Sequence, residues 1–309
     1  MTVDGAIERT ARYADDWNRY SRQWESQYGA QYEWLGDEWN DDSTPDRRRD
    51  AFFFQAHAER WITPATTALE IGPGGGKWTV RLARKVERLV VLDVAEEMLE
   101  RTRSRCERLG LTNVEYVLGN GRDFQPIADE SVDFVFSYDV FVHVALEDAW
   151  PYGHEIVRVL RPGGLGACHY AIGSTPEAWD HIEQHNDWYR GGQHTLGQYF
   201  YFSPEMLRRM AERCGLRVVE QHVVGVCCTC VVEKPATSPV PRLEQLLARL
   251  ISRDADDDRV RADVALRLQA LVTELARGVD TIVGEAQREP DFYKRLRFAA
   301  AIRRLWRGI

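Results

Sequence analysis

The segment ALEIGPGGGKWTV, residues 68–80, indicates the fold class of the chain. Its apolar start has the pattern of a buried strand, four glycines and a proline follow, and KWTV begins a helix-like pattern. A strand, a glycine-rich turn and a helix N-terminus together direct backbone N–H groups toward a ligand. The segment therefore predicts an α/β domain that binds a ligand at this turn.

Two phosphate-binding motifs fail at the turn. A phosphate-binding loop, G-x-x-x-x-G-K-[ST], would need Ser or Thr in place of Trp78. The dinucleotide motif G-x-G-x-x-G would need its third glycine where Lys77 or Thr79 stands. The pattern that is present is E-x-G-x-G-x-G over residues 70–76.

Strand and helix patterns alternate from about residue 63 to residue 234. The strand candidates are residues 66–71, 88–93, 114–118, 132–137, 164–171, 217–224 and 226–232. Helices between the first five imply parallel strands with crossover connections, whereas only Gly225 separates the last two, as in an antiparallel hairpin. The prediction is a doubly wound α/β fold: a mostly parallel, seven-stranded sheet with an antiparallel last strand.

Composition divides the chain into three regions. They are an N-terminal aromatic helical region, residues 1–60, the α/β domain, residues 61–235, with a substrate-loop insertion at 173–202, and a C-terminal helical extension, residues 236–309. The aromatic helix can pack on the domain or cover a ligand as a lid. In the extension, residues 260–283 have coiled-coil-like apolar spacing, for packing on the domain or pairing with a second copy. The basic amphipathic tail, residues 292–309, fits an anionic membrane surface, an acidic partner or its own protein.

Composition also excludes several classes of protein. A net charge of −8 argues against nucleic-acid binding. No apolar run approaches the roughly 20 residues that span a bilayer, and the N-terminus lacks a signal-peptide pattern. Six cysteines without disulfide-like spacing favour a reducing compartment. We therefore expect a cytoplasmic protein, which the basic tail can bring to the inner face of the membrane.

The glycine turn, with Glu70, Gly72, Gly74 and Gly76, resembles motif I of class I S-adenosylmethionine-dependent methyltransferases. Glycines there let the backbone approach the amino-acid part of the cofactor without obstruction by a Cβ atom. The segment EIVRVLRPGG, residues 155–164, resembles the helix, turn and fifth strand typical of this family. The resemblance covers about residues 60–235. It implies a Rossmann-like fold, S-adenosylmethionine as cofactor and similarity to bacterial small-molecule and sugar O-methyltransferases.

The resemblance also implies where the cofactor binds. Asp93 ends the second strand, where a carboxylate accepts hydrogen bonds from both ribose hydroxyls. Gly121 stands where the family usually carries an adenine-binding Asp, so the adenine contact falls on the Asn120 side chain or on the backbone around Gly121 and Arg122, with Asp123 as the other candidate. The expected cofactor-binding residues are Glu70, Gly72, Pro73, Gly74, Gly76, Trp78, Asp93, Met98, Asn120, Gly121, Arg122, Ser137 and Tyr138.

Methyl transfer to a hydroxyl needs an aligned acceptor and a base that removes the proton. His143 follows the fourth strand and His169 lies near the end of the fifth, at the edge where ligands of open α/β sheets bind. Both are candidate bases, and each has a structural alternative in packing or capping. Asp139 is expected near the sulfonium or the acceptor, with a structural hydrogen bond as the alternative.

The insertion at 173–202 is long for a connection and rich in aromatic and polar residues, which indicates an acceptor pocket or cap. His181 and His185 lie one helical turn apart and, with His194, have spacing compatible with a metal, but no metal is expected. The predicted reaction is O-methylation of a sugar, a glycan or another hydroxylated metabolite. Two alternatives are an NAD-dependent oxidoreductase, which the missing third glycine disfavours, and a non-catalytic S-adenosylmethionine-binding assembly module.

Overall fold

The computed structural model describes residues 3–39, 53–190 and 198–235. The chain divides into two compact units, Met1–Pro235 and Ala236–Ile309, and the second lies outside the described residues. The coiled-coil-like stretch, the pairing of copies through residues 260–283 and the membrane contact of the basic tail fall there and stay predictions. Among the described residues, no helix is both long and apolar enough to cross a bilayer.

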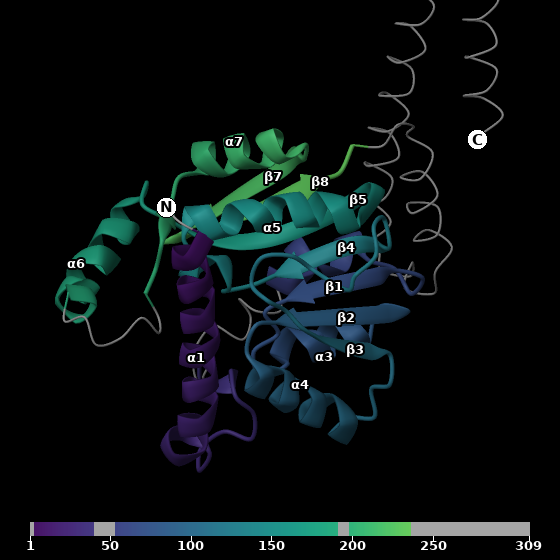
Figure 1. The fold of residues 1–309 in the computed structure, drawn as a ribbon, viewed down its shortest axis with the longest axis horizontal. Helices are drawn as coiled ribbons and strands as arrows, with labels where there is room; N and C mark the ends of the chain where they lie inside the picture. The colour runs from purple at the N-terminus through teal and green to yellow at the C-terminus, as the bar shows by residue number, and fades with distance from the viewer. Residues whose placement is uncertain (1–2, 40–52, 191–197, 236–309) are drawn as a thin grey trace, which may run out of the picture. The chain divides into compact units, whose positions relative to one another are not determined.

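An eight-stranded sheet forms the centre of the first unit (Figure 1). Its strands are β1 Thr67–Ile71, β2 Arg88–Asp93, β3 Val114–Leu118, β4 Val132–Ser137, β5 Leu160–Ile172, β6 Tyr201–Phe202, β7 Arg217–Val224 and β8 Cys227–Glu233. The order is β3-β2-β1-β4-β5-β8-β7, and β6 pairs with β5. All pairs are parallel except those that β8 makes with β5 and β7. The predicted fold class is confirmed. The sequence did not predict β6, since two residues show no periodicity.

Helices cover both faces of the sheet. The helices of the first unit include α1 Val3–Tyr28, α3 Lys77–Ala83, α4 Glu96–Arg108, α5 Leu146–Val159, α6 Pro176–Arg190 and α7 Pro204–Cys214, with the short 3-10 helices η1 Asp37–Trp39, η2 Glu59–Trp61 and η3 Phe141–His143. Strand residues alternate between two cores: Leu69 packs in the core that contains Ile156 of α5 and Leu207 of α7. Ala68 packs in the core that contains Leu82 of α3. This period of two is what a sheet buried on both faces requires.

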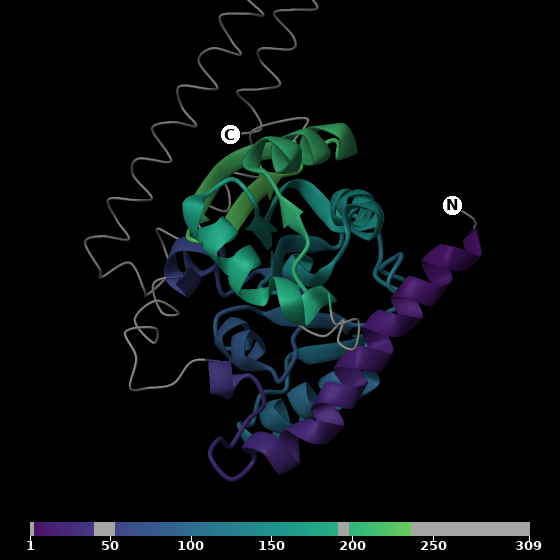
Figure 2. The ribbon, with the colours of Figure 1, turned by 90° about the vertical axis from the view of Figure 1, so that its left-hand side faces the viewer.

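The long helix α1 lies at one end of the sheet, next to α4 (Figures 1 and 2). Trp24 is only 1% exposed and packs in a small core with Met98 of α4. The Asn18 side chain accepts a hydrogen bond from Glu97 N at 3.0 Å, and Ser21 Oγ accepts one from Arg101 Nε at 2.7 Å. Part of the aromatic face of α1 is therefore used for docking on α4.

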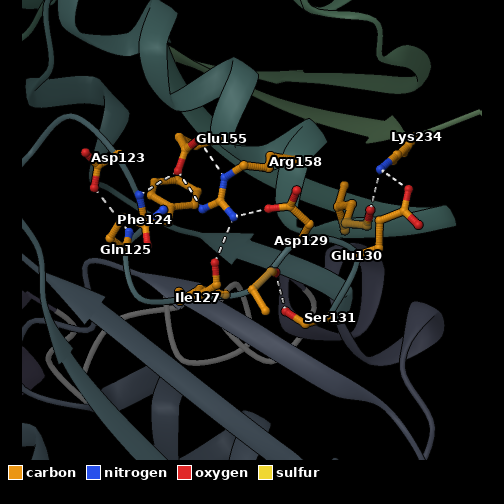
Figure 3. A network of polar contacts seen from close by, with 12 residues as sticks. Asp123, Phe124, Gln125, Ile127, Asp129, Glu130, Ser131, Glu155, Arg158 and Lys234 are labelled. Carbon is orange, nitrogen blue, oxygen red and sulfur yellow. Dashed lines mark hydrogen bonds and ion pairs between the residues drawn. The ribbon is translucent and has the colours of Figure 1, made fainter.

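A polar network ties the loop between β3 and β4 to α5 (Figure 3). Arg158 donates to both carboxylate oxygens of Glu155, at 2.8 and 2.7 Å, and to the Ile127 carbonyl at 2.8 Å. Glu155 also accepts a hydrogen bond from Phe124 N at 2.7 Å. Two residues of the EIVRVLRPGG segment thus hold the loop that leads from β3 to the cavity described below.

Trp24→Ala is expected to lower the free energy of unfolding by about 3–5 kcal/mol, because it removes a fully buried indole from the contact between α1 and α4. Urea unfolding of the full chain measures the loss. The matched control is Trp179→Ala on α6, where the side chain is 57% exposed and the expected change is within about 0.5 kcal/mol. Equal losses for the two variants would contradict the docking of α1 on α4.

Candidate functional site

A cavity of about 240 Å³ lies at the carboxyl ends of β1, β2 and β4. The glycine turn forms its floor, and α1 contributes Tyr13 and Trp17 to its wall. Eight of the thirteen expected cofactor-binding residues line it: Gly72, Pro73, Gly74, Trp78, Asp93, Met98, Gly121 and Tyr138. The cavity therefore lies where ligands of open α/β sheets bind, outside the carboxyl ends of the strands.

The glycine turn has no room for a side chain at two of its positions, Gly72 and Gly75. A Cβ atom at Gly72 would lie 2.2 Å from Val140 Cγ2, and the residue has φ +68°. A Cβ atom at Gly75 would lie 1.9 Å from the Leu35 carbonyl oxygen. Because real Cβ atoms do not approach so closely, the turn must present bare backbone to the segments that close over it.

Helix α4 donates two hydrogen bonds to carbonyl groups of the glycine turn. Thr102 Oγ1 donates to the Gly74 carbonyl at 2.8 Å, and Arg105 Nη1 donates to the Gly75 carbonyl at 3.2 Å. Arg105 also pairs with Asp37 at 3.2 Å, so the same side chain ties down the segment after α1. The carbonyls of Gly74 and Gly75 are thus satisfied within the protein.

Three expected cofactor-binding residues support the turn without lining the cavity. Glu70 is 1% exposed and accepts a hydrogen bond from Thr79 Oγ1 at 2.6 Å. Burial raises the pKa of Glu70 to about 8, although the Thr79 hydroxyl opposes that shift. Ser137 Oγ donates to the Ile71 carbonyl at 3.1 Å, and Gly76 caps α3 in a left-handed conformation. Their contacts hold the loop in its conformation.

Asp93 places a buried carboxylate on the cavity wall at the end of β2. Oδ1 accepts a hydrogen bond from Ala95 N at 2.9 Å. Burial raises the pKa of Asp93 to about 6, and backbone N–H groups counteract part of that shift. The bare glycine backbone and this carboxylate fit the adenosyl amino acid that the resemblance implies, and the contact of Asp93 with ribose stays a prediction.

The loop after β3 brings only part of the expected adenine contact to the cavity. Gly121 lines the cavity, but Asn120 and Arg122 do not. Asn120 Oδ1 accepts hydrogen bonds from the backbone N–H groups of Arg122 and Asp123, at 2.9 and 3.0 Å. The amide of Asn120 therefore stabilises the loop itself. Gly121 is the one of these three residues that lines the cavity, and its contact with adenine stays a prediction.

His143, in η3, lines the cavity. Its Nδ1 lies 3.0 Å from the Gln198 carbonyl oxygen. A carbonyl only accepts hydrogen bonds, so Nδ1 carries the proton and Nε2 of the neutral ring is a free acceptor. Burial lowers the pKa of His143, which keeps the ring neutral at physiological pH. The Trp17 ring packs against it in a T-shaped contact at 5.3 Å.

The structure places His169 behind the cavity wall rather than on it. The side chain is buried and stacks on Tyr138, with 4.5 Å between ring centroids. Its Nδ1 lies 2.8 Å from Asp139 Oδ1, and Asp139 itself lines the cavity. Burial alone would lower the pKa of His169, but the Asp139 carboxylate and the Cys227 thiol raise it to about 9. An imidazolium cannot accept a proton, so position and charge favour His143 as the base.

Asp139 adopts a backbone conformation that is uncommon for a residue other than glycine. Its φ is +56°, in the left-handed region, at the second residue after the end of β4. Such conformations are kept where the surroundings hold them, and they concentrate at functional sites. Contact with His169 is one interaction that holds this carboxylate at the edge of the cavity.

Five polar or aromatic residues of the cavity wall were not in the expected site: Tyr13, Trp17, Lys77, Asp148 and Tyr152. Tyr13 OH donates to Asp148 Oδ2 at 3.1 Å, across 135 positions of sequence. The helical spacing of Tyr13 and Trp17 in α1, and of Asp148 and Tyr152 in α5, was a signal that each pair shares a face. Nothing local indicated that the two faces meet.

The insertion reaches the site through its last residues. Most of its described part is helix α6, on which His181 Nδ1 lies 2.7 Å from Tyr201 OH and His185 Nδ1 lies 2.8 Å from the His181 carbonyl. Tyr199 contacts the His143 ring at 5.4 Å. Within the part of the chain that the structure describes, no cluster of side chains suits a metal ion. The third histidine of the predicted spacing, His194, lies outside that part.

Residues 69–168 match a protein family described as "Methyltransferase domain". A demethylmenaquinone methyltransferase from Bacillus cereus (strain ATCC 10987 / NRS 248) is 32% identical over 113 residues, which cover 35% of this chain and 45% of the relative. A second, from Bacillus anthracis (strain CDC 684 / NRRL 3495), has the same identity and coverage. The chain thus spans less than half the length of the curated relatives that it matches.

Among solved structures, the cyclase SpnF superposes with a TM-score of 0.52 at 15% identity and covers 64% of this chain and 85% of its own. This likeness shows the fold alone. For the matched segment, the predicted methyltransferase class is confirmed. The finer resemblance to sugar O-methyltransferases is not supported by relatives whose names concern demethylmenaquinone.

Gly72→Ala is expected to destabilise the protein by about 2–5 kcal/mol, since the new methyl group overlaps Val140 and the left-handed backbone is strained. Gly74→Ala is the matched control: its φ is +56° but its Cβ atom would meet nothing within 4 Å, so only the backbone cost of about 1–2 kcal/mol applies. Urea unfolding separates the two. Equal losses would mean that Val140 yields without cost.

Proposed function

We propose that this chain transfers the methyl group of S-adenosylmethionine to a hydroxyl oxygen of a small acceptor, with His143 as the base. The observation that carries the proposal is the contact of His143 Nδ1 with the Gln198 carbonyl. It assigns the proton to Nδ1 and leaves Nε2 of a cavity-lining ring able to take a proton.

S-adenosylmethionine supplies an electrophilic methyl group on a sulfonium. The glycine turn and Asp93 bind and orient the donor, and the aromatic wall that includes Trp17 keeps water out. As the acceptor oxygen forms its bond to the methyl carbon and the carbon–sulfur bond breaks, the hydroxyl proton passes to His143 Nε2. The contact between Asp139 and His169 stabilises the part of the cavity wall that lies beside His143.

The acceptor that we propose is a hydroxylated metabolite such as a sugar or a glycan. A ring of the demethylmenaquinone kind is the second candidate, because the relatives carry that name. The aromatic rings of Tyr13, Trp17 and Tyr152 on the wall suit a flat ring as well as the apolar face of a sugar. Incubation with methyl-labelled cofactor and mass spectrometry of each acceptor class for a gain of one CH₂ unit distinguishes them.

The two rival functions make different predictions in the same assay. An oxidoreductase would bind NADH in calorimetric titration and would not bind S-adenosylhomocysteine. A non-catalytic module would bind S-adenosylhomocysteine normally while no acceptor gained label. Binding of S-adenosylhomocysteine together with labelling of an acceptor is the result that supports methyl transfer.

His143→Gln is expected to lower kcat by about 100-fold or more, because it removes the base while leaving the donor site intact. The affinity for S-adenosylhomocysteine should stay within twofold, roughly the precision of such titrations. The matched control is His154→Gln on α5, where the ring is exposed and lies outside the cavity wall. Full activity of His143→Gln would remove the assignment.

The pH dependence of kcat/KM tests which histidine is the base. Only a neutral imidazole accepts the proton, and burial lowers the pKa of His143 below its ordinary value of 6.5. We therefore expect the acid limb of the profile below pH 6.5, and loss of that limb in His143→Gln. A rate that rises until about pH 9 would instead point to His169, whose pKa is raised to about 9.

A further inference from the structure

A short helical turn packs against the sheet next to the cavity without lining it. Residues 53–57 are helical, and the Ala58 N–H donates to the Phe54 carbonyl at 2.9 Å. Phe54 and Ala58 are buried in the core that contains Ala68 of β1 and Leu82 of α3. Residues 53–58, the covering turn, are therefore held on this face of the sheet by apolar packing.

Two rings of the covering turn contact aromatic residues of the cavity wall. The centroid of the Phe53 ring lies 4.4 Å from that of Tyr138, and Phe54 stacks on Trp78 at 6.0 Å. Tyr138 and Trp78 both line the cavity, and both are among the residues expected to bind the donor. A covering turn that moved off the sheet would remove the packing that supports these two rings.

The covering turn also carries a buried histidine with an unpaired ring nitrogen. His57 is 5% exposed, and within the described part of the chain its Nδ1 has no hydrogen-bond partner. The Phe53 ring packs on it with 4.6 Å between centroids. A neutral imidazole has one donor nitrogen and one acceptor nitrogen, whereas a protonated one has two donors. Protonation of His57 would therefore bury a charge and leave an N–H group unpaired, and both are costly.

The charged groups that face His57 increase this cost. The His222 ring of β7 lies 4.7 Å from the His57 ring. Arg60 of η2 and His169 of β5 add positive charge nearby. Glu220 of β7 is the carboxylate that opposes them, but it already pairs with Arg60 and lies 2.8 Å from His222 Nε2. Burial first, and then the neighbouring positive groups, lower the pKa of His57 to about 4.

We propose that the covering turn is an acid-sensitive support of the donor site: when His57 takes up a proton, the turn leaves the sheet and withdraws its two phenylalanine rings from the cavity wall. This inference rests on the proposed function, because it concerns the regulation of the same donor site. In the opened turn the ring regains its ordinary pKa of 6.5, so the proton is bound more tightly by the opened turn than by the closed one. The closed turn is therefore fully favoured above pH 6.5 and loses stability as the pH falls toward 4.

Amide hydrogen exchange of the full chain measures how often the covering turn opens. The reporter is the Ala58 N–H, because its hydrogen bond to Phe54 closes the turn. From pH 7 to pH 5 we expect its protection factor, which is corrected for the intrinsic effect of pH on exchange, to fall about 20-fold. The Gly72 N–H, which donates to the Leu92 carbonyl at 2.8 Å, reports on the sheet and should exchange more slowly than Ala58.

Variants of His57 test whether this histidine takes up the proton. His57→Gln does not titrate in this range, so the fall in Ala58 protection should shrink to about twofold or less. His57→Leu has the same expected result with an apolar side chain, should the amide prevent folding. The matched control is His154→Gln on α5, where the ring is exposed, and it should keep the 20-fold fall.

Ligand binding tests whether the covering turn supports the donor site. S-adenosylhomocysteine at about 100 times its Kd stabilises a closed turn by up to about 100-fold if the opened turn cannot bind it. We expect the Ala58 protection factor at pH 5 to rise at least about tenfold under these conditions.

Three results would overturn the inference while S-adenosylhomocysteine binds. An equal fall in protection in His57→Gln and His57→Leu would remove the role of His57. Exchange of Ala58 no faster than that of Gly72 would mean that the turn does not open separately from the sheet. Unchanged Ala58 protection with bound S-adenosylhomocysteine would separate the turn from the donor site. If S-adenosylhomocysteine does not bind at all, the proposed function itself fails, and the role of the turn at a donor site fails with it.

Discussion

The site depends on the close approach of other segments to the glycine turn. The Leu35 carbonyl oxygen occupies the position that a Cβ atom at residue 75 would need, and Val140 occupies the corresponding space at Gly72. A segment after α1 and a segment after β4 can therefore close over the turn only because it is bare backbone. The same packing brings α1 and η3 to the cavity. The residues proposed to bind the donor and those proposed to contact the acceptor therefore lie around one cavity.

Helix α4 stabilises the glycine turn through hydrogen bonds to its backbone. Thr102 and Arg105 satisfy the carbonyls of Gly74 and Gly75, and Arg105 also pairs with Asp37 next to the closing segment. Buried carbonyls without such donors would be costly. Because α1 docks on α4 through Trp24, the wall that carries Trp17 is positioned by the helix that also holds the turn.

The two histidines at the carboxyl edge of the sheet show how environment divides roles between identical side chains. His143 has a carbonyl as its Nδ1 partner and a lowered pKa, so it is neutral with one acceptor nitrogen. His169 has a carboxylate as its neighbour and a raised pKa, so it is charged. One is suited to take a proton, and the other is suited to hold Asp139 in place.

The sequence by itself determined the order of strands and helices and the nature of the donor turn. Periods of two and 3.6, the glycines of residues 72–76 and the single Gly225 between the last strands are local signals, readable within a few residues. It also indicated both histidines as candidates, because His143 follows the fourth strand and His169 lies near the end of the fifth.

Only the tertiary structure decided which histidine faces the cavity, that Asn120 stabilises its own loop, and that Tyr13 meets Asp148. These contacts join segments that lie far apart in the chain, or depend on which way a loop turns. Their geometry arises when α1, α4 and α5 pack around the turn, and no local period encodes that packing. The spacing of hydrophobic residues specifies the helices and strands. The burial and hydrogen-bond partners of a side chain, which the tertiary structure sets, specify its chemistry.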